Sequence, residues 1–356
     1  MRVVVTGACG FVGRALVQHL VERGSIEVTG LDSLVRAGSE TNLGELRELG
    51  VRLVHGDIRV KSDVDALPEA DWLIDAAANP SVLAGTPGFG SSAQLVEHNL
   101  GGTLHMLEYC RRTGAGFVLL STSRVYSVAP LAALALTERN AAYVPVWAEA
   151  PPGIGEYGIR ESFPAEPPLS LYGATKRASE ILALEYGAAF GFPVWIDRCG
   201  VLAGAGQFAR ADQGIFSYWL HRWKSGRPLR YIGFDGQGRQ VRDCLHPLDL
   251  AGLVVQQLQA GPAGGRPQVV NVGGGAKSAC SLAELSTWCR ERWGAHEVGV
   301  ERGPRPYDLP WVVLDARLAE STWSWRPRRS LHEILEEIAR HAEARPDWLE
   351  RTGGAG

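Results

Sequence analysis

The feature that most constrains the fold of this chain is a run of spaced glycines near its start, Thr6-Gly-Ala-Cys-Gly-Phe-Val-Gly13. A strand-like apolar run, 2–6, leads into it, and apolar residues at helical spacing follow it as far as Gly24. In such a strand, turn and helix, the glycines permit a tight turn, close approach of the backbone to a pyrophosphate, and close packing of the helix on the strand. The sequence therefore predicts a dinucleotide-binding unit whose cofactor contacts are Gly7, Gly10, Phe11, Val12 and Gly13.

The next predicted strand, 28–32, ends in an acid at the distance expected for a group that binds the adenosine ribose. A carboxylate at Asp32 would repel a 2′-phosphate, so this residue favours NAD over NADP. Arg36 is the one nearby residue that argues for NADP. We therefore expect NAD as the cofactor.

Strand candidates at 51–55, 72–77 and 117–121 alternate with helical patterns, of which 94–112 is the clearest. This alternation predicts an α/β fold with a doubly wound parallel Rossmann sheet. Ligands of such sheets lie beyond the carboxyl ends of the strands. Further cofactor-binding candidates are Asp57, Ile58, Ala77 and Ala78 at strand ends, and Asn99 within the predicted helix.

Tyr172 and Lys176 lie four residues apart at the head of a predicted helix, and therefore on the same face. A phenol has a pKa of about 10, but a neighbouring ammonium stabilises the phenolate and makes it a better proton acceptor. The pair alone is weak evidence, because a lysine beside a half-buried tyrosine is common on helices. A hydroxyl from Thr122 or Ser123, at the end of the 117–121 strand, is the candidate third group.

A long connection over 127–169 separates these two segments, and it is apolar at 131–136 and proline-rich at 145–168. Its large apolar residues argue against disorder. It is either a segment that extends over the substrate site or an insertion on the protein surface.

The regular alternation stops after a strand expected over 193–199. The stretch 240–246 and a helix near 248–258 are expected to rejoin the sheet, and 269–273 resembles a short last strand. Capping boxes, Ser281 with Glu284 and Ser330 with Glu333, open two terminal helices. We expect a Rossmann domain of residues 1–197 and 240–274, and a smaller interleaved lobe of residues 198–239 and 275–356.

Composition excludes several classes of function. The net charge of -3 gives no general attraction to nucleic acid or to anionic membranes, and no apolar run approaches the length of a membrane span. The six cysteines are scattered without a Cys-x-x-Cys pair, which argues against a zinc site or a disulfide framework. We expect a cytoplasmic protein that binds no metal, nucleic acid or membrane.

With these residues in view, the chain resembles the extended short-chain dehydrogenases/reductases, and among them the nucleotide-sugar epimerases. TGACGFVG resembles the cofactor loop of that family, STSRVYS its strand end, LYGATK its Tyr-Lys pair and RDCLHPLDLA its Arg-Asp-x-x-His stretch. By this resemblance Thr122 occupies the position of the catalytic hydroxyl. The resemblance also implies that Arg242 and Arg305 contact the substrate diphosphate and that Asp308 contacts the nucleotide ribose.

Within the family, AANPSVLAG, GQFARADQGIFSYW and GRQVRDCLH most resemble the CDP-paratose 2-epimerase (CDP-tyvelose 2-epimerase) branch. The resemblance implies that the substrate pocket is shaped by Ser123, Gln207, Phe208 and Gln213. Tyr126-Ser127 replaces the common Tyr-Gly, and Val201 stands where many members have Asn. Ser123-Arg124 replaces the Asp-Glu pair with which the 4,6-dehydratases eliminate water, and this disfavours dehydration.

The resemblance implies that Tyr172 accepts a proton from a sugar hydroxyl while NAD accepts the hydride from the same carbon. Return of the hydride to the other face of the ketosugar gives the epimer. The expected substrate is a nucleotide-diphosphate sugar, with a CDP-hexose or CDP-deoxyhexose favoured and inversion at carbon 2, and the expected assembly is a homodimer. The alternatives are a UDP-hexose 4-epimerase, a net NAD-dependent oxidoreductase and a non-catalytic NAD-binding protein.

Overall fold

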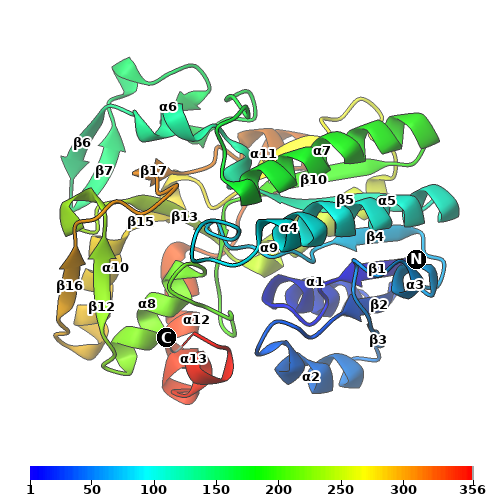
Figure 1. The fold of residues 1–356 in the computed structure, drawn as a ribbon, viewed down its shortest axis with the longest axis horizontal. Helices are drawn as coiled ribbons and strands as arrows, with labels where there is room; N and C mark the ends of the chain where they lie inside the picture. Colours follow the sequence, from blue (N-terminus) through cyan, green and yellow to red (C-terminus); the bar gives the residue numbers. More distant parts are fainter. Residues whose placement is uncertain (355–356) are drawn as a thin grey trace.

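The computed structural model describes residues 1–354 and is built around a parallel sheet of seven strands, in the right half of Figure 1. The strand order is β14-β10-β5-β4-β1-β2-β3, so the order reverses between β1 and β4. This arrangement confirms the predicted doubly wound α/β sheet. Its strands are β1 (Arg2–Thr6), β2 (Glu27–Asp32), β3 (Arg52–His55), β4 (Trp72–Asp75), β5 (Gly116–Thr122), β10 (Val194–Cys199) and β14 (Val269–Val272).

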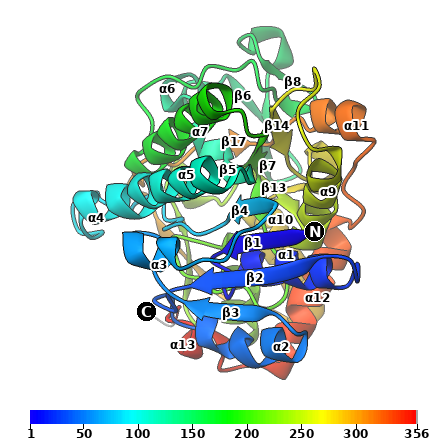
Figure 2. The same cartoon turned by 90° about the vertical axis from the view of Figure 1, so that its right-hand side faces the viewer.

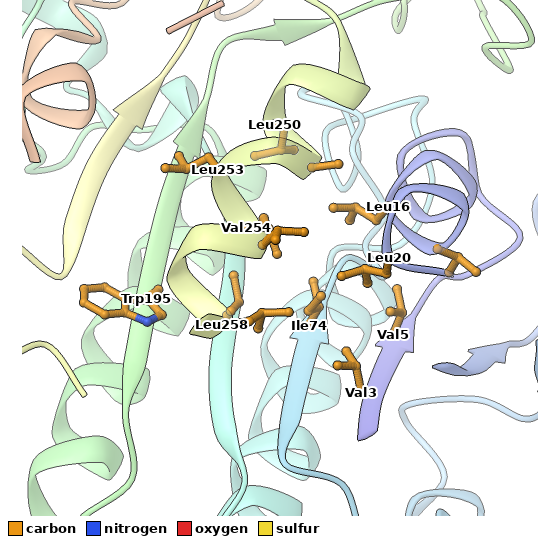
Figure 3. Packing of buried hydrophobic residues seen from close by; sticks show 14 of the residues in the cluster. Val3, Val5, Leu16, Leu20, Ile74, Trp195, Leu250, Leu253, Val254 and Leu258 are labelled. Carbon is orange, nitrogen blue, oxygen red and sulfur yellow. The ribbon is translucent and has the colours of Figure 1, made fainter. Parts of the chain in front are cut away.

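Helices cover both faces of this sheet, as Figure 2 shows. Helices α1 (Phe11–Val21) and α9 (Pro247–Ala260) lie on one face, and α3 (Lys61–Asp65), α5 (Gly102–Thr113) and α7 (Leu171–Phe190) lie on the other. Because side chains alternate along a strand, Val3 and Val5 of β1 join the first core, whereas Val4 joins the second. Figure 3 shows the first core, in which Leu16 and Leu20 of α1 meet Leu250 and Val254 of α9 above the strands.

The predicted helix over 94–112 is interrupted by one wider turn. It consists of α4 (Ser92–Val96), a π-helical turn over Glu97–Gly101, and α5. Such turns often occur at functional sites, and this one carries the buried side chain of Asn99.

A smaller lobe, in the left half of Figure 1, contains a four-stranded sheet and the pair β12 (Leu229–Ile232) and β16 (Val298–Glu301). The four strands are β11 (Val201–Leu202), β13 (Val241–Leu245), β15 (Ala279–Ser281) and β17 (Trp311–Val312). Its helices include α8 (Ile215–Lys224), α10 (Leu282–Trp293), α12 (Leu331–Ala344) and α13 (Trp348–Arg351). Both predicted capping boxes are present, at the starts of α10 and α12.

One expected strand position is wrong. The stretch 240–246 does form a strand, β13, but it pairs with β11, β15 and β17 and does not rejoin the main sheet. The free edge of β10 is taken by β14, which pairs Ile196 with Val269. Only α9 and β14 return to the main sheet from this part of the chain.

The connection over 127–169 is ordered. It forms α6 (Val128–Ala132) and the hairpins β6–β7 (Leu136–Arg139, Ala142–Pro145) and β8–β9 (Ile154–Gly155, Gly158–Ile159). Its apolar residues pack with β17 and the residues that follow it in a core of their own. Within residues 1–354, no helix has the length and apolar character needed to cross a membrane.

Candidate active site

A cavity of about 650 Å³ lies where the strand order of the main sheet reverses, between that sheet and the smaller lobe. Its sheet side is lined by Gly7, Ala77, Thr122 and Cys199, at or just beyond the carboxyl ends of β1, β4, β5 and β10. This is the position at which doubly wound sheets bind ligands. No residue of 127–169 lines the cavity, so this connection does not form the cover that was one of its two expected roles.

The glycine loop lies at one end of the cavity and requires its glycines for steric reasons. Gly7 has a φ of 63°, and a Cβ at Gly13 would stand 1.9 Å from the carbonyl oxygen of Gly7. A Cβ at Gly10 would meet only that same oxygen, at 3.1 Å. The loop therefore brings the start of α1 to the cavity, and the N-terminus of a helix is a suitable site for a bound pyrophosphate.

Asp32 is held in place at the end of β2. Its Oδ2 accepts a hydrogen bond from the backbone N–H of Cys9 and its Oδ1 accepts one from that of Leu34, both at 2.8 Å. Arg36, the residue that argued for NADP, donates to the carbonyl oxygen of Phe208, and burial lowers the pKa of its guanidinium to about 10. The residues at this end of the cavity therefore fit a dinucleotide whose adenosine ribose carries no 2′-phosphate.

Asn99 does not line the cavity, contrary to its assignment as a cofactor contact. Its amide oxygen accepts from the N–H of Asn79 at 2.8 Å, and its amide nitrogen donates to the Asn79 carbonyl at 3.0 Å and to Thr175 Oγ1 at 3.3 Å. Because Asn79 follows Ala77 and Ala78, which do line the cavity, Asn99 acts by fixing this strand-end loop.

Thr122 and Tyr172 meet at the centre of the cavity wall. Thr122 ends β5, and Tyr172 lies in the first turn of α7, where the N-cap Ser170 accepts from the N–H of Gly173 at 3.0 Å. A Cβ at Gly173 would stand 2.2 Å from the carbonyl oxygen of Arg124, so this glycine lets the helix start pack against the strand end. Burial raises the pKa of Tyr172 to about 12, while the Thr122 hydroxyl and the charge of Arg124 act in the opposite direction.

The structure does not show the expected action of Lys176 on the Tyr172 phenol. Lys176 is buried, does not line the cavity, and is not among the groups that lower the pKa of Tyr172. Burial lowers the pKa of Lys176, and the charges of Asp75 and Glu180 raise it. The four-residue spacing places both residues on one helix face, and the Lys176 ammonium interacts with the charges of Asp75 and Glu180 and with Cys199, which lines the cavity. The role of Lys176 stays a prediction.

Guanidinium groups from three segments, Arg124, Arg242 and Arg305, also line the cavity. Arg242 Nη2 lies 2.8 Å from Asp308 Oδ1, and Arg124 Nη1 donates to the carbonyl oxygen of Tyr307 at 3.1 Å. Three positive charges thus face one carboxylate, which gives this end of the cavity an excess of positive charge suited to a diphosphate.

The loop 207–214 closes one side of the cavity, where Phe208 and Gln213 are lining residues. The side-chain Nε2 of Gln207 donates to the backbone carbonyl oxygen of Leu202 at 2.7 Å. The backbone carbonyl oxygen of Gln207 accepts from Trp348 Nε1 at 2.9 Å. The buried side-chain Oε1 of Gln207 has no hydrogen-bond partner among the described residues.

Apart from Lys176 and Asn99, every residue proposed from the sequence as a site residue lines this one cavity. Sequence reasoning missed Arg124, Asn79 and Tyr307 as lining residues. The sequence did contain a signal for two of these lining residues. Arg124 directly follows the hydroxyl residues Thr122 and Ser123, and Tyr307 lies inside the Arg305–Asp308 stretch. The remaining proposed residues that line the cavity include Ile58, Asp57, Ser123 and those of the glycine loop.

Comparison with known proteins identifies the family. Residues 3–273 match the NAD dependent epimerase/dehydratase family. The chain belongs to this family. It is an enzyme of the nucleotide-sugar epimerase/dehydratase class, and its cofactor is NAD.

Two curated relatives of this epimerase/dehydratase match over nearly its whole length. CDP-paratose 2-epimerase of Salmonella typhi is 29% identical over 345 residues, which are 95% of this chain and 98% of the relative. A dTDP-glucose 4,6-dehydratase of Streptomyces antibioticus is 32% identical over 363 residues, 98% of this chain and 94% of the relative.

Solved structures share the fold. UDP-glucose 4-epimerase of Thermus thermophilus, in complex with NAD, has a TM-score of 0.74 and 27% identity over 96% of this chain and 99% of that chain. UDP-glucuronic acid 4-epimerase of Bacillus cereus, in complex with UDP-glucuronic acid and NAD, has a TM-score of 0.77 and 23% identity over 97% of this chain and 99% of that chain.

Proposed function

We propose that this epimerase/dehydratase is an NAD-dependent epimerase that inverts carbon 2 of a nucleotide-diphosphate sugar, with a CDP-linked hexose or deoxyhexose as substrate. The observation that supports this most strongly is that Thr122 and Tyr172 line the same cavity as the glycine loop and the guanidinium groups of Arg242 and Arg305. A sugar tethered by its diphosphate to those arginines reaches the Tyr172 phenol and the cofactor from the same cavity.

The residues beside Thr122 favour epimerisation over dehydration. A 4,6-dehydratase must also protonate a leaving hydroxyl and remove a proton from the adjoining carbon, which requires acid and base groups near the sugar. The chain has Ser123 and Arg124 at those positions, and the acidic residues that line the cavity are Asp32, Asp57, Asp212 and Asp308. Asp57 is paired with Arg59 and Asp308 with Arg242, so neither is a free acid beside Tyr172.

The choice of carbon 2 and of CDP follows the Salmonella typhi relative and the three sequence segments that resemble the 2-epimerase branch. Direct oxidation of carbon 2 requires only the proton acceptor already present, and no second base. Inversion at carbon 4 of a UDP-hexose uses the same residues on a differently placed sugar, and it is the second candidate because solved 4-epimerases share the fold. The homodimer, the cytoplasmic location and the domain bounds expected from the sequence stay predictions.

The positions of the residues support the following roles. The Thr122 hydroxyl holds the substrate oxygen, and Tyr172 accepts the proton from it as the carbon becomes a ketone. Bound NAD would supply the hydride acceptor and, when oxidised, a positive charge that favours the phenolate, and it would hold the hydride for return to the other face of the ketosugar. Tyr172 returns the proton to the oxygen as the carbon regains this hydride, so that no net oxidation results.

A substrate panel tests the proposal. The purified protein is incubated with CDP-, UDP-, GDP- and dTDP-hexoses, and products are identified by NMR. We expect a carbon 2 epimer from a CDP-sugar with no added cofactor. A carbon 4 epimer would move the assignment to the second candidate. Net release of NADH would identify an oxidoreductase, and no product from any sugar would favour a non-catalytic NAD-binding protein.

A further inference from the structure

Arg124 has a position in the cavity that the proposed mechanism does not use. It follows Thr122 and Ser123 in a short 3-10 turn after β5, and its backbone N–H donates to Thr122 Oγ1 at 3.2 Å. Its carbonyl oxygen lies where a Cβ of Gly173 would be, beside Tyr172. The backbone of Arg124 is therefore fixed between the two segments that carry the reacting hydroxyl groups.

The guanidinium of Arg124 extends from this point toward the other side of the cavity. Its Nη1 donates to the carbonyl oxygen of Tyr307 at 3.1 Å, between Arg305 and Asp308. None of the ion pairs within residues 1–354 includes Arg124, and the nearby carboxylate of Asp308 is paired with Arg242 at 2.8 Å. A guanidinium has five N–H donors. Because Arg124 lines the cavity, most of its donors are free to bind a ligand there.

The surrounding charges indicate which ligand group these donors meet. The charges of Arg242 and Arg305 act on Arg124, which means that the three guanidinium groups lie in one region and repel one another. An anion with more than one negative charge compensates for this repulsion. Arg124 is the member of the three that lies beside Tyr172, and the reacting sugar must also lie there. The anionic group closest to the sugar in a nucleotide-diphosphate sugar is the phosphate bonded to it.

We propose that Arg124 binds the sugar-side phosphate of the substrate and so makes the site specific for nucleoside diphosphates over monophosphates. This inference rests on the proposed function. Together with Arg242, Arg124 fixes the phosphate about which the ketosugar turns. Because the backbone of the same residue contacts Thr122 and packs against Gly173, next to Tyr172, the phosphate is anchored beside both reacting hydroxyl groups.

The test compares the binding of CMP, CDP, UMP and UDP to the NAD-loaded protein by calorimetry. We expect Arg124→Gln to weaken the binding of the diphosphates by about tenfold or more and to change that of the monophosphates by less than about twofold. Arg124→Lys keeps the positive charge but loses the planar, bidentate arrangement of N–H donors. It should therefore recover part of the diphosphate affinity that Arg124→Gln loses. Arg230→Gln, at an exposed arginine of β12, is the matched control and should match the wild type.

Other outcomes contradict the inference in distinguishable ways. Equal weakening of mono- and diphosphates by Arg124→Gln would overturn it, as would unchanged binding of both. Unchanged binding together with a shifted pH profile of turnover would assign Arg124 to Tyr172 and not to the phosphate. Bound NAD and the near-UV circular dichroism of each variant verify folding. If the wild type itself binds none of the four nucleotides, the proposed function fails before the inference is tested.

Discussion

The carboxylate of Asp32 and the backbone N–H of Cys9 are joined by a hydrogen bond of 2.8 Å. Cys9 lies within the glycine loop, so the acid that should bind the ribose and the loop that should bind the phosphates form one rigid unit. The second carboxylate oxygen accepts from the N–H of Leu34, also at 2.8 Å. A substitution of Asp32 therefore affects both the cofactor and the local backbone.

Asp32→Ala should weaken NAD binding by about tenfold or more, because a charged partner of the ribose hydroxyls is lost. It should also lower the free energy of unfolding of the NAD-free protein by about 1–3 kcal/mol, because the N–H groups of Cys9 and Leu34 lose their acceptor. Titration calorimetry and chemical denaturation measure the two effects. Asp71→Ala is the control, since Asp71 accepts from a backbone N–H at the exposed end of β1. Wild-type NAD affinity in Asp32→Ala would exclude the assigned role.

Tyr172→Phe should retain NAD and nucleotide binding and lose most turnover, by about 10²-fold to 10⁴-fold, because the ring packing remains and only the proton acceptor is removed. Lys176→Met should also be severely impaired. The double variant should be little worse than Tyr172→Phe alone if both residues serve one proton transfer. Steady-state kinetics of the three variants give the answer. Fully additive losses would show that Lys176, whose ammonium lies in the interior, acts elsewhere.

Arg305→Ala should raise KM by about tenfold and change kcat little, because a charge-assisted contact to the diphosphate is present in both the ground state and the transition state. Steady-state kinetics with the active nucleotide sugar separate the two constants. Arg302→Ala, in the exposed segment just before, is the control. A fall in kcat with unchanged KM would contradict a binding role.

A histidine pair, in which His221 is buried and His341 is half-buried, should make stability depend on pH. His341 Nδ1 and His221 Nε2 lie 3.3 Å apart between α12 and α8. Burial lowers the pKa of His221 to about 3 and that of His341 to about 4. The unfolded chain takes up these protons at about pH 6.5, and the folded chain does so only near pH 4 or below. Their contribution to stability is thus present above pH 6.5 and is lost as the pH falls from about 6.5 to 4.

Thermal and chemical unfolding between pH 7 and 4.5 measure this effect. The wild type should lose about 1–2 kcal/mol per pH unit from the pair, and His221→Gln should lose distinctly less. His332→Gln, at the exposed start of α12, should behave as the wild type. Identical slopes in His221→Gln and wild type would contradict the prediction.

The sequence allowed the strands of the main sheet and the glycine loop to be predicted, because both depend on local spacing. The pairing of β13 was not predictable in this way, since the residues of a strand do not indicate which sheet edge is free. Lys176 shows a similar limit: its spacing from Tyr172 gives the helix face but not the direction of a long side chain. Asn99 was correctly placed on a helix, but its contact with Asn79 depends on a π-turn that the helical pattern does not indicate.

The central claim is that one carbon is oxidised and reduced inside the cavity, with Tyr172 moving the proton and NAD holding the hydride. The path of the hydrogen at the inverted carbon tests it most directly. The active nucleotide sugar is brought to equilibrium in D₂O, and substrate deuterated at carbon 2 is converted in H₂O, with mass and NMR analysis of each product. Direct oxidation and reduction of carbon 2 predicts no solvent deuterium in the product and full retention of the carbon 2 label. Solvent deuterium at the inverted carbon would contradict it, because that carbon would then be deprotonated by a base that the cavity wall around Thr122 and Tyr172 does not provide.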